Sequence, residues 1–441
     1  MLAEGRRLFG TDGVRGKANE ELTVDFAMDL ARAAADDITG PVVIGRDTRR
    51  SGEMLSLAMQ AGFHSVGVDT EDLGIIPTAA IAHLTDEVDA SMGVVVSASH
   101  NPAEDNGIKF FGGDGGKLSD ALEDQIELRL RQGAPWRVPR SGVGIRIPRR
   151  DATDQYLDWL KRDVAYTLRG IDVAVDAANG AAFLAAPRLF EELGLNVAAF
   201  ACEPDGLNIN DGCGATHPDY LAGRAGGRIG LVFDGDADRF IAIDESGLPV
   251  NGDVIMAIIA RHLYEQGALK NDTVVVTVMT NLGFRRAMDD LGINVIETAV
   301  GDRYVLEAMR EHKANLGGEQ SGHVIFLDHI GTGDGLLTAL RLLEVVAATG
   351  QPLTELRQVM TEYPQVLRNV RVTDRAGLDA ADAVWAAVRH TEELLGAGGR
   401  VLIRPSGTEP LVRVMVEAAT KSDAATIADD LASVVRGALG E

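Results

Sequence analysis

Three aspartates that alternate along a short segment could bind one divalent cation. Asp234, Asp236 and Asp238 lie in the segment DGDADR, directly after the apolar run IGLVF. Because this run is typical of a strand, the segment that follows is predicted to be a loop in which the three carboxylates can converge. Mg²⁺ prefers oxygen ligands and keeps positions for water and phosphate. We therefore predict a magnesium site in this aspartate loop (residues 234–239), with a solvated acidic turn as the alternative.

A calcium-binding EF-hand is a competing interpretation of the same aspartates. The sixth position of an EF-hand loop needs a glycine for its sharp turn, and Arg239 occupies that position here. The residues that follow, FIAID, are typical of a strand, and the flanking helical patterns of an EF-hand are missing. The sequence therefore argues against calcium, and three close carboxylates without any cation would repel one another.

A serine next to a histidine could take part in group transfer. Ser99 and His100 are adjacent in VSASHNP, the serine loop (residues 96–102). A serine hydroxyl becomes a nucleophile or a phosphate carrier when a base or an acid stands nearby. Lys109, in DNGIKFF, could neutralise or deprotonate an oxygen in the same place. The alternatives are an Asn-Pro turn whose serines bond to local backbone, and an exposed lysine.

A polar loop and two glycine-containing loops could recognise a substrate. Glu319, Ser321 and His323 in GGEQSGH, the EQS loop (residues 317–323), could bind sugar hydroxyls or an amine, because they combine hydrogen-bond donors and acceptors. Arg15, in GTDGVRG, suggests an anion contact. For each of these two loops, an ordinary surface loop is the alternative.

The second glycine-containing loop is RPSGTEPLVR, the C-terminal loop. It lies between two strand-like runs. It could cradle a phosphate, because backbone N–H groups around a glycine form an anion-binding nest and arginines add forked donors. A simple hairpin loop is the alternative. The candidate phosphate ligands are Arg404, Ser406, Gly407, Thr408 and Arg413.

The elements that must position these loops follow an α/β pattern. Strand-like runs that end in loops are followed by helical patterns, which we place at Gly52–Ala61, Ala185–Leu193 and Phe284–Leu291. After each helical pattern, a second strand leads into the serine loop, the aspartate loop or the EQS loop. Strands alternating with helices predict parallel sheets. Ligands bind at the carboxyl edge of such sheets.

Breaks in this pattern predict four domains. Residues 133–150 are rich in Gly, Pro and Arg, and further breaks fall at Gly247–Asp253 and at Tyr363–Arg368. A smaller segment follows, with a helical pattern at Ala380–Leu395 between strand-like runs. We predict three similar mixed α/β sheet domains and a smaller C-terminal α+β domain. Their predicted ranges are 1–150, 151–250, 251–365 and 366–441.

Composition excludes several classes of protein. The 441 residues contain 42 Lys+Arg and 66 Asp+Glu, a net charge of −24 at pH 7, which argues against a general nucleic-acid binder. Cys202 and Cys213 are the two cysteines and form no CxxC, so neither a disulfide framework nor a structural zinc site is indicated. The N-terminus lacks a signal-peptide core, and no apolar run approaches about 18 residues. We predict a cytoplasmic protein without a membrane partner.

Six segments, taken in order, resemble one known superfamily. LFGTDGVRG, SASHNP, DGDADR, VGDRYV, GGEQSGH and RPSGTEPLVRVMVE span nearly the whole chain. Together they resemble the α-D-phosphohexomutase superfamily, and within it the phosphoglucosamine mutase family. The choice of this branch rests on GGEQSGH and on LFGTDGVRG. Relatives that act on mannose or glucose phosphates usually carry GEMSGH-like or GEESGG-like loops.

The resemblance implies a four-domain fold around a central cleft, with a phosphoserine at Ser99. It implies one Mg²⁺ per active site, held by Asp234, Asp236 and Asp238 together with a phosphoserine oxygen. Arg15, His100, Lys109 and Arg239 then surround the transferring phosphoryl group. Glu319, Ser321 and His323 belong to sugar recognition. The residues of the C-terminal loop that bind the non-reacting phosphate are Arg404, Ser406, Gly407, Thr408 and Arg413.

The implied activity is an intramolecular phosphotransfer of the isomerase class. Glucosamine 6-phosphate and glucosamine 1-phosphate interconvert through a 1,6-bisphosphate, feeding amino-sugar nucleotide synthesis, and His100 and Lys109 are both candidate bases. A phosphomannomutase/phosphoglucomutase of the same superfamily is the alternative. A serine hydrolase is disfavoured because no GxSxG-type elbow is evident, and a non-catalytic sugar-phosphate-binding module would leave the serine and the aspartates unexplained. A homodimer is expected from the family alone.

Overall fold

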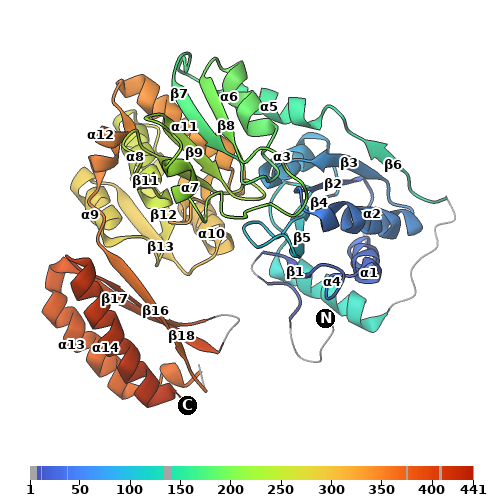
Figure 1. Cartoon of the computed structure of the whole chain (residues 1–441). Coiled ribbons are helices and arrows are strands. Elements are labelled where there is room, and N and C mark those ends of the chain that lie inside the picture. Colours follow the sequence, from blue (N-terminus) through green and yellow to red (C-terminus); the bar gives the residue numbers. More distant parts are fainter. Residues whose placement is uncertain are drawn as a thin grey trace. The chain divides into compact units, whose positions relative to one another are not determined.

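The computed structural model describes residues 7–10, 12–36, 38–133, 142–373, 376–406 and 410–440 of the chain. These residues form two compact units (Figure 1). Unit 1 comprises Met1–Met279 and Ile293–Gln358, and unit 2 comprises Thr280–Gly292 and Val359–Glu441. The described parts contain four sheets, three in unit 1 and one in unit 2.

The first sheet of unit 1 has the strand order β1-β5-β4-β2-β3-β6. Alternate residues of its central strands, such as Ile44 and Val94, are buried in one core with helices α1, α2 and α4, because successive side chains of a strand point to opposite faces. Helix α3 contacts the central strands β2 and β4 as well. The strands are β1 (Val14–Lys17), β2 (Val42–Arg46), β3 (Thr70–Ile75), β4 (Met92–Val96), β5 (Asp105–Gly112) and β6 (Arg146–Pro148), and the helices are α1 (Val24–Ala34), α2 (Arg50–Ser65), α3 (Thr78–Glu87) and α4 (Asp120–Gln132).

The second and third sheets have the orders β11-β10-β9-β7-β8 and β13-β12-β14-β15. The second sheet contains β7 (Asp172–Asp176), β8 (Asn196–Phe200), β9 (Ile229–Phe233), β10 (Phe240–Ile243) and β11 (Pro249–Val250), with helices α5 (Ala152–Arg162), α6 (Ala185–Glu192) and α7 (Asp219–Ala222). The third contains β12 (Thr273–Thr277), β13 (Asn294–Thr298), β14 (Leu316–Gly318) and β15 (Val324–Phe326), with helices α8 (Gly252–Glu265), α10 (Asp302–His312), α11 (Gly335–Thr349) and α12 (Leu353–Leu356).

The three sheets share one arrangement of four strands. In each sheet, one central strand (β2, β7 or β12) pairs in parallel with a strand on either side. The later of these two outer strands then forms an antiparallel hairpin with the next strand in sequence. These hairpins are β4–β5, β9–β10 and β14–β15. The serine loop, the aspartate loop and the EQS loop connect them, in that order. The predicted chemistry-bearing loops therefore lie at the same topological position in three similar domains.

Unit 2 is built on an antiparallel sheet of order β16-β18-β17. Helices α13 and α14 contact each other and cover this sheet (Figure 1, red). Valines of the strands, including Val370 and Val414, share a core with Ala428 and Val435 of α14. The elements are β16 (Gln365–Arg371), β17 (Arg400–Pro405), β18 (Leu411–Glu417), α9 (Leu282–Leu291), α13 (Asp382–Leu395) and α14 (Lys421–Leu439).

The structure confirms the predicted fold class of three mixed α/β sheet domains and a smaller α+β domain. The predicted helices also appear, with ends that differ by a few residues: the pattern at Gly52–Ala61, for example, is part of the longer α2. Both cysteines are free thiols. The exact domain borders stay a prediction.

Among the described residues, no single helix has the length and the apolar composition needed to cross a membrane. One bent pair of helices, Gly335–Thr349 and Leu353–Val359, reaches that length and composition only when its two parts are taken together, and the parts meet at a 97° bend.

The close packing of α1 on α2 gives a prediction about stability. A Cβ at Gly62 would lie 2.4 Å from the backbone oxygen of Met28 and 2.7 Å from Ala31 Cβ. Gly62→Ala should therefore force the helices apart and destabilise unit 1 by about 1–3 kcal/mol. We expect calorimetry to show a lower unfolding temperature.

Gly437→Ala is the matched control, because nothing lies within 4 Å of a Cβ at this position of α14. Alanine is the better helix former by about 0.5–1 kcal/mol, so this variant should be as stable as the parent or more stable. An unchanged unfolding temperature for Gly62→Ala would contradict the tight packing of α1 on α2.

Candidate active site

The serine loop and the aspartate loop meet at the Ser99 hydroxyl. Ser99 Oγ donates a hydrogen bond of 2.6 Å to Asp234 Oδ2, and His100 Nδ1 lies 3.2 Å from the same oxygen. Ser99 is 1% exposed. A buried hydroxyl is thus held between a carboxylate and an imidazole, which is an arrangement suited to a nucleophile.

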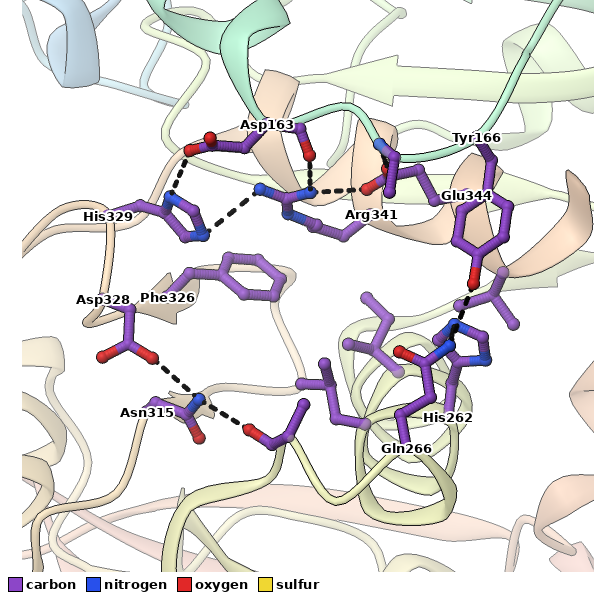
Figure 2. A pocket seen from close by; sticks show the side chains of 15 residues that line it. Asp163, Tyr166, His262, Gln266, Asn315, Phe326, Asp328, His329, Arg341 and Glu344 are labelled. Carbon is purple, nitrogen blue, oxygen red and sulfur yellow. Dashed lines mark hydrogen bonds and ion pairs between the residues drawn. The ribbon is translucent and has the colours of Figure 1, made fainter. Parts of the chain in front are cut away.

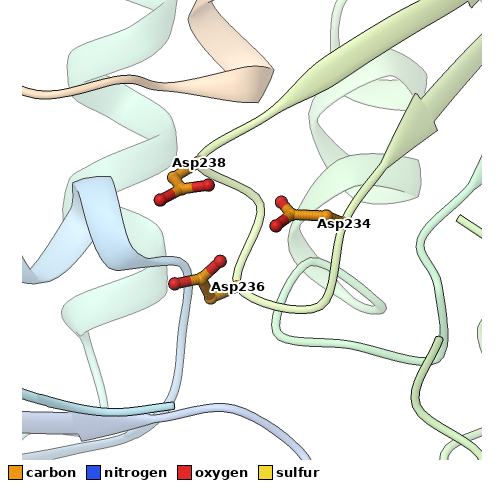
Figure 3. A group of neighbouring side chains, drawn as sticks. All are labelled: Asp234, Asp236 and Asp238. Atoms are coloured by element: carbon orange, nitrogen blue, oxygen red, sulfur yellow. The ribbon is translucent and has the colours of Figure 1, made fainter. Parts of the chain in front are cut away.

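The three aspartates of the aspartate loop offer carboxylate oxygens that lie within 4.8 Å of one another, and all three residues are buried. Figure 3 shows the three side chains turned toward a shared space. Burial and the charges of Asp238 and Asp236 raise the pKa of Asp234 well above its ordinary value. Burial also acts to raise the pKa of Asp238, but Lys109, His323 and Arg239 outweigh it, so that this pKa is lowered.

Lys109 is a buried cation beside these carboxylates. Its Nζ lies 2.9 Å from Asp236 Oδ2 and 2.9 Å from Asp12 Oδ2, and 3.6 Å from Asp238 Oδ2. Burial alone would lower the pKa of Lys109, but the three carboxylates raise it above its ordinary value. The alternative of an exposed lysine is therefore wrong, because the side chain is 3% exposed.

Two arginines add positive charge around Ser99. Arg15 Nη1 donates to Asn101 Oδ1 at 3.0 Å, and the backbone N–H of Arg239 donates to Asp234 Oδ1 at 3.2 Å. Burial, together with the charges of Arg239 and Arg15, lowers the pKa of His100 to about 4. At neutral pH the imidazole beside Ser99 is therefore uncharged.

Four buried polar atoms of this site have no hydrogen-bond partner among the described residues. They are Oδ1 of Asp236, Oδ1 of Asp238, Nε of Arg15 and Nε of Arg239. A buried polar atom without a partner costs roughly 1–3 kcal/mol. Asp238 Oδ1 and Arg239 Nε lie 3.9 Å apart, an ion pair too long for a hydrogen bond. The two acceptors suit a cation and the two donors suit an anion. The side chains present therefore fit a divalent cation next to a phosphate group.

The ion pairs around the aspartate loop close into a ring. Lys117 Nζ lies 3.1 Å from Asp12 Oδ1 and also contacts Asp302. Asp302 Oδ2 is 3.5 Å from His323 Nε2, and His323 Nδ1 is 3.6 Å from Asp238 Oδ2. Burial lowers the pKa of His323, but Asp238 and Asp302 outweigh it and the pKa is raised. The members of this ion ring are Asp238, Lys109, Asp12, Lys117, Asp302 and His323.

The three predicted residues of the EQS loop lie in two different environments. Ser321 Oγ lies 3.5 Å from Glu319 Oε2, and Glu319 Oε1 accepts the Gly301 N–H at 3.1 Å. His323 is instead buried against Asp238, inside the ion ring. The structure thus groups Glu319 with Ser321, and joins His323 to the aspartate loop.

A cavity of about 390 Å³ opens beside these residues. It is lined by Arg239 and Ser321 together with Thr216, Asn251 and Gln320, among others. The cavity therefore joins the aspartate loop to the EQS loop, and five of its seven lining residues are polar.

Another cavity, of about 340 Å³, lies between α8, α11 and residues 163–166 (Figure 2). Its polar side chains bond to one another: His329 lies between Asp163 and Arg341, and Gln266 donates to Tyr166 Oη. None of the predicted site residues that the structure describes lines this cavity. It is therefore separate from the site around Ser99.

The C-terminal loop lies in unit 2, at the β17–β18 hairpin. Arg404 and Arg413 are direct cross-strand partners, and the Ser406 N–H donates to the Leu411 carbonyl at 2.8 Å. The two arginines therefore lie side by side at the end of this hairpin. Gly407 and Thr408 lie outside the described residues.

Comparison with known proteins identifies the family. Models described as phosphoglucomutase/phosphomannomutase match the chain in order: alpha/beta/alpha domain I at residues 6–135, domain II at 154–247, domain III at 251–363 and the C-terminal domain at 367–434. A phosphoglucosamine mutase of Desulforamulus reducens is 50% identical over 439 residues, covering 97% of this chain and 99% of the relative. The chain belongs to the phosphoglucosamine mutase family.

Solved structures of the superfamily share the fold. A phosphoglucomutase/phosphomannomutase family protein from Burkholderia thailandensis is 26% identical, with a TM-score of 0.83 and coverage of 98% of this chain and 97% of that one. N-acetylphosphoglucosamine mutase from Aspergillus fumigatus, solved with GlcNAc-6P and magnesium, is 20% identical, with a TM-score of 0.70 and coverage of 98% and 96%. The family and superfamily inferred from six sequence segments are thus confirmed.

Several residues of this phosphoglucosamine mutase family member reach the site without having been predicted. Asp12 and Asp302 lie inside GTDGVRG and VGDRYV, two of the segments that resemble the superfamily. Their charge within a matched segment could have marked them as candidate site residues. Thr78, whose Oγ1 donates to Asp236 Oδ2 at 2.8 Å, carries no such signal. Its contact depends on α3 meeting the aspartate loop in three dimensions.

The aspartate loop gives a prediction about metal binding. Asp234→Asn removes one of three converging charges, so the affinity for Mg²⁺ should fall more than about tenfold, as measured by isothermal titration calorimetry. Asp176→Asn is the matched control. Asp176 is also buried and ends strand β7 of the same sheet, where it accepts the Ala178 and Gly214 N–H groups. Equal Mg²⁺ affinities of the two variants would contradict the metal site.

Proposed function

We propose that this protein is an isomerase that interconverts glucosamine 6-phosphate and glucosamine 1-phosphate. The observation that carries the proposal is the buried Ser99 hydroxyl, 2.6 Å from Asp234 of the aspartate triad, in a chain that belongs to the phosphoglucosamine mutase family. The serine supplies a covalent carrier for phosphate, and the triad supplies a place for a cation beside it.

In the proposed reaction, Ser99 begins as a phosphoserine. The P–Oγ bond breaks while a bond forms between phosphorus and O1 of glucosamine 6-phosphate, and the proton of that hydroxyl passes to a base. The 1,6-bisphosphate then turns around in the site. Its 6-phosphoryl group returns to Ser99, O6 takes a proton, and glucosamine 1-phosphate leaves. Phosphorus and protons balance, and the enzyme is restored.

Charge stabilisation and positioning dominate catalysis of phosphoryl transfer. Asp234, Asp236 and Asp238, with an oxygen of phosphorylated Ser99, would hold one Mg²⁺, which when bound supplies positive charge to the phosphoryl oxygens. Arg15 Nε and Arg239 Nε are buried donors without a hydrogen-bond partner among the described residues, although Arg239 Nε lies 3.9 Å from Asp238 Oδ1, and this supports a role of both arginines in binding the phosphoryl group. His100 and Lys109 are the two candidates for the base.

Substrate recognition is assigned to the EQS loop and the C-terminal loop. Glu319 and Ser321 bind the sugar beside the cavity, and His323 holds the EQS loop to the aspartate loop. In unit 2, the non-reacting phosphate is bound by Arg404, Ser406, Gly407, Thr408 and Arg413. We further propose that the borders of the four domains follow the predicted ranges, that the protein is cytoplasmic, in keeping with its free thiols, and that it forms a homodimer.

Replacing the serine tests the phosphate carrier. Ser99→Ala should lower turnover by more than about 1,000-fold, because no covalent phosphoryl intermediate can form. Intact mass spectrometry should show loss of the phosphate adduct. Ser433→Ala removes an exposed hydroxyl that bonds to the Asp429 carbonyl within α14, and should behave as the parent. An active and still phosphorylated Ser99→Ala enzyme would refute the assignment.

Substrate comparison tests the branch of the superfamily. We expect kcat/KM for glucosamine 6-phosphate to exceed those for glucose and mannose 6-phosphates by at least about tenfold, because these carry an uncharged hydroxyl where glucosamine carries an ammonium that can form a charge-assisted hydrogen bond with a carboxylate. Glu319→Gln should reduce this preference, since it removes the carboxylate that faces an amine. A poor rate with glucosamine 6-phosphate would favour a phosphomannomutase/phosphoglucomutase instead.

A further inference from the structure

The backbone of Ser99 is held in an unusual conformation. Its φ is +51°, in the left-handed region that residues other than glycine seldom adopt. Such a conformation costs of order 1 kcal/mol or more and persists only where the surroundings fix it. The Ser99 N–H donates to Ser97 Oγ at 2.9 Å. The Ser99 carbonyl accepts from Arg49 Nη2 at 2.9 Å and from Asn210 Nδ2 at 3.0 Å.

Arg49 is the largest contributor to this arrangement. Its side chain is fully buried, and its guanidinium reaches four carbonyls between Ser99 and Asp105. Nη2 donates to the carbonyls of Ser99 and Asn101 at 2.9 and 2.8 Å, and Nη1 donates to those of Asp105, at 3.1 Å, and Pro102. Nε pairs with Asp47 at 2.9 Å. All three nitrogens of the guanidinium are thus engaged, which a lysine could not reproduce.

Asp47 and Ser97 close a circuit around Ser99. Asp47 Oδ2 accepts both Arg49 Nε and the Ser97 hydroxyl, the latter at 2.6 Å. Since Ser97 Oγ accepts the Ser99 N–H, the N–H of Ser99 is connected to Asp47 through Ser97. The carbonyl of Ser99 bonds to Arg49, so both backbone groups are linked to the buried Asp47–Arg49 ion pair. The nucleophile is therefore fixed from both sides of its own residue.

Asn210 connects this circuit to the sheet that carries the aspartate loop. Its Nδ2 donates to the carbonyls of Ser99 and Asn101, at 3.0 and 3.2 Å. Beside it, a Cβ at Gly235 would lie 2.4 Å from the Ser99 carbonyl oxygen. The backbones of the serine and aspartate loops thus touch directly, one residue away from Asp234.

We infer that Asp47, Arg49, Ser97 and Asn210 form a serine clamp that positions Ser99 for phosphoryl transfer. The clamp bonds to the backbone around the nucleophile rather than to the reacting hydroxyl, so its members are positioning residues and not catalytic ones. Displacement of a reacting group by about 1 Å can cost roughly 100-fold in rate. This inference rests on the proposed function of Ser99.

Variants of the clamp separate positioning from general stability. Arg49→Lys keeps the charge next to Asp47 but loses most of the carbonyl contacts. Ser97→Ala removes the bond to the Ser99 N–H with little change in volume. Both should lower kcat, by about 100-fold and about 10-fold respectively, with KM for glucosamine 6-phosphate within about threefold of the parent. Asn210→Ala should behave like Ser97→Ala.

Tyr156→Phe is the matched control. Tyr156 is fully buried, and its hydroxyl bonds to Asp334 and to none of the four clamp residues. The variant should lose stability while kcat stays within about twofold of the parent. A clamp variant that loses no more kcat than Tyr156→Phe, or that raises KM as much as it lowers kcat, would overturn the clamp.

Amide hydrogen exchange tests the clamp without any assay of activity. The peptide that spans residues 96–101 should exchange at least about tenfold faster in Arg49→Lys and Ser97→Ala than in the parent or in Tyr156→Phe. Unchanged exchange would overturn the clamp, even if kcat fell. If the parent enzyme itself shows no mutase activity, the proposed function fails, and the exchange rates alone decide whether the clamp exists.

Discussion

The burial of three like charges in the aspartate loop is the constraint on which the site depends. Asp234, Asp236 and Asp238 are at most 5% exposed. Charges taken out of water cost several kcal/mol each unless partners compensate them. Lys109 meets this demand directly, and the ion ring extends the compensation through neighbouring loops. Asp236 Oδ1 and Asp238 Oδ1 nevertheless keep no hydrogen-bond partner among the described residues, which leaves a cation as the fitting complement.

The repeated topology explains how segments far apart in sequence can supply the charges that compensate the aspartate loop. Each sheet of unit 1 places a hairpin at the same position, so the serine, aspartate and EQS loops are equivalent parts of three domains. The ion ring draws Lys109 from the first sheet, Asp238 from the second and His323 from the third. A change in any one domain that shifted its hairpin would therefore disturb charges contributed by the other two.

Local patterns could be predicted from the sequence, and contacts between distant segments could not. The spacing of Asp234, Asp236 and Asp238 predicts a cation site because all three residues come from one loop. Helices such as α6 and α13 follow from periodicity and were found within a residue or two of their predicted ends. Arg49, in contrast, precedes the helical pattern predicted at Gly52–Ala61 and was not among the candidate site residues. Its role depends on carbonyls about 50 residues away, and a carbonyl has no sequence signature.

A protein with a net charge of −24 is expected to repel an anionic substrate. The partners of its buried arginines explain how it could still bind one. Arg49 forms an ion pair with Asp47, and its other donors bond to backbone carbonyls. It therefore holds the serine loop in place and attracts an anion only weakly. Arg15 and Arg239 also have carboxylate partners, Asp12 and Asp238, but each keeps a buried Nε donor without a hydrogen-bond partner among the described residues, which suits an anion. Net charge describes solubility and non-specific association. Binding of a phosphate depends instead on which arginines the fold leaves with donors to offer.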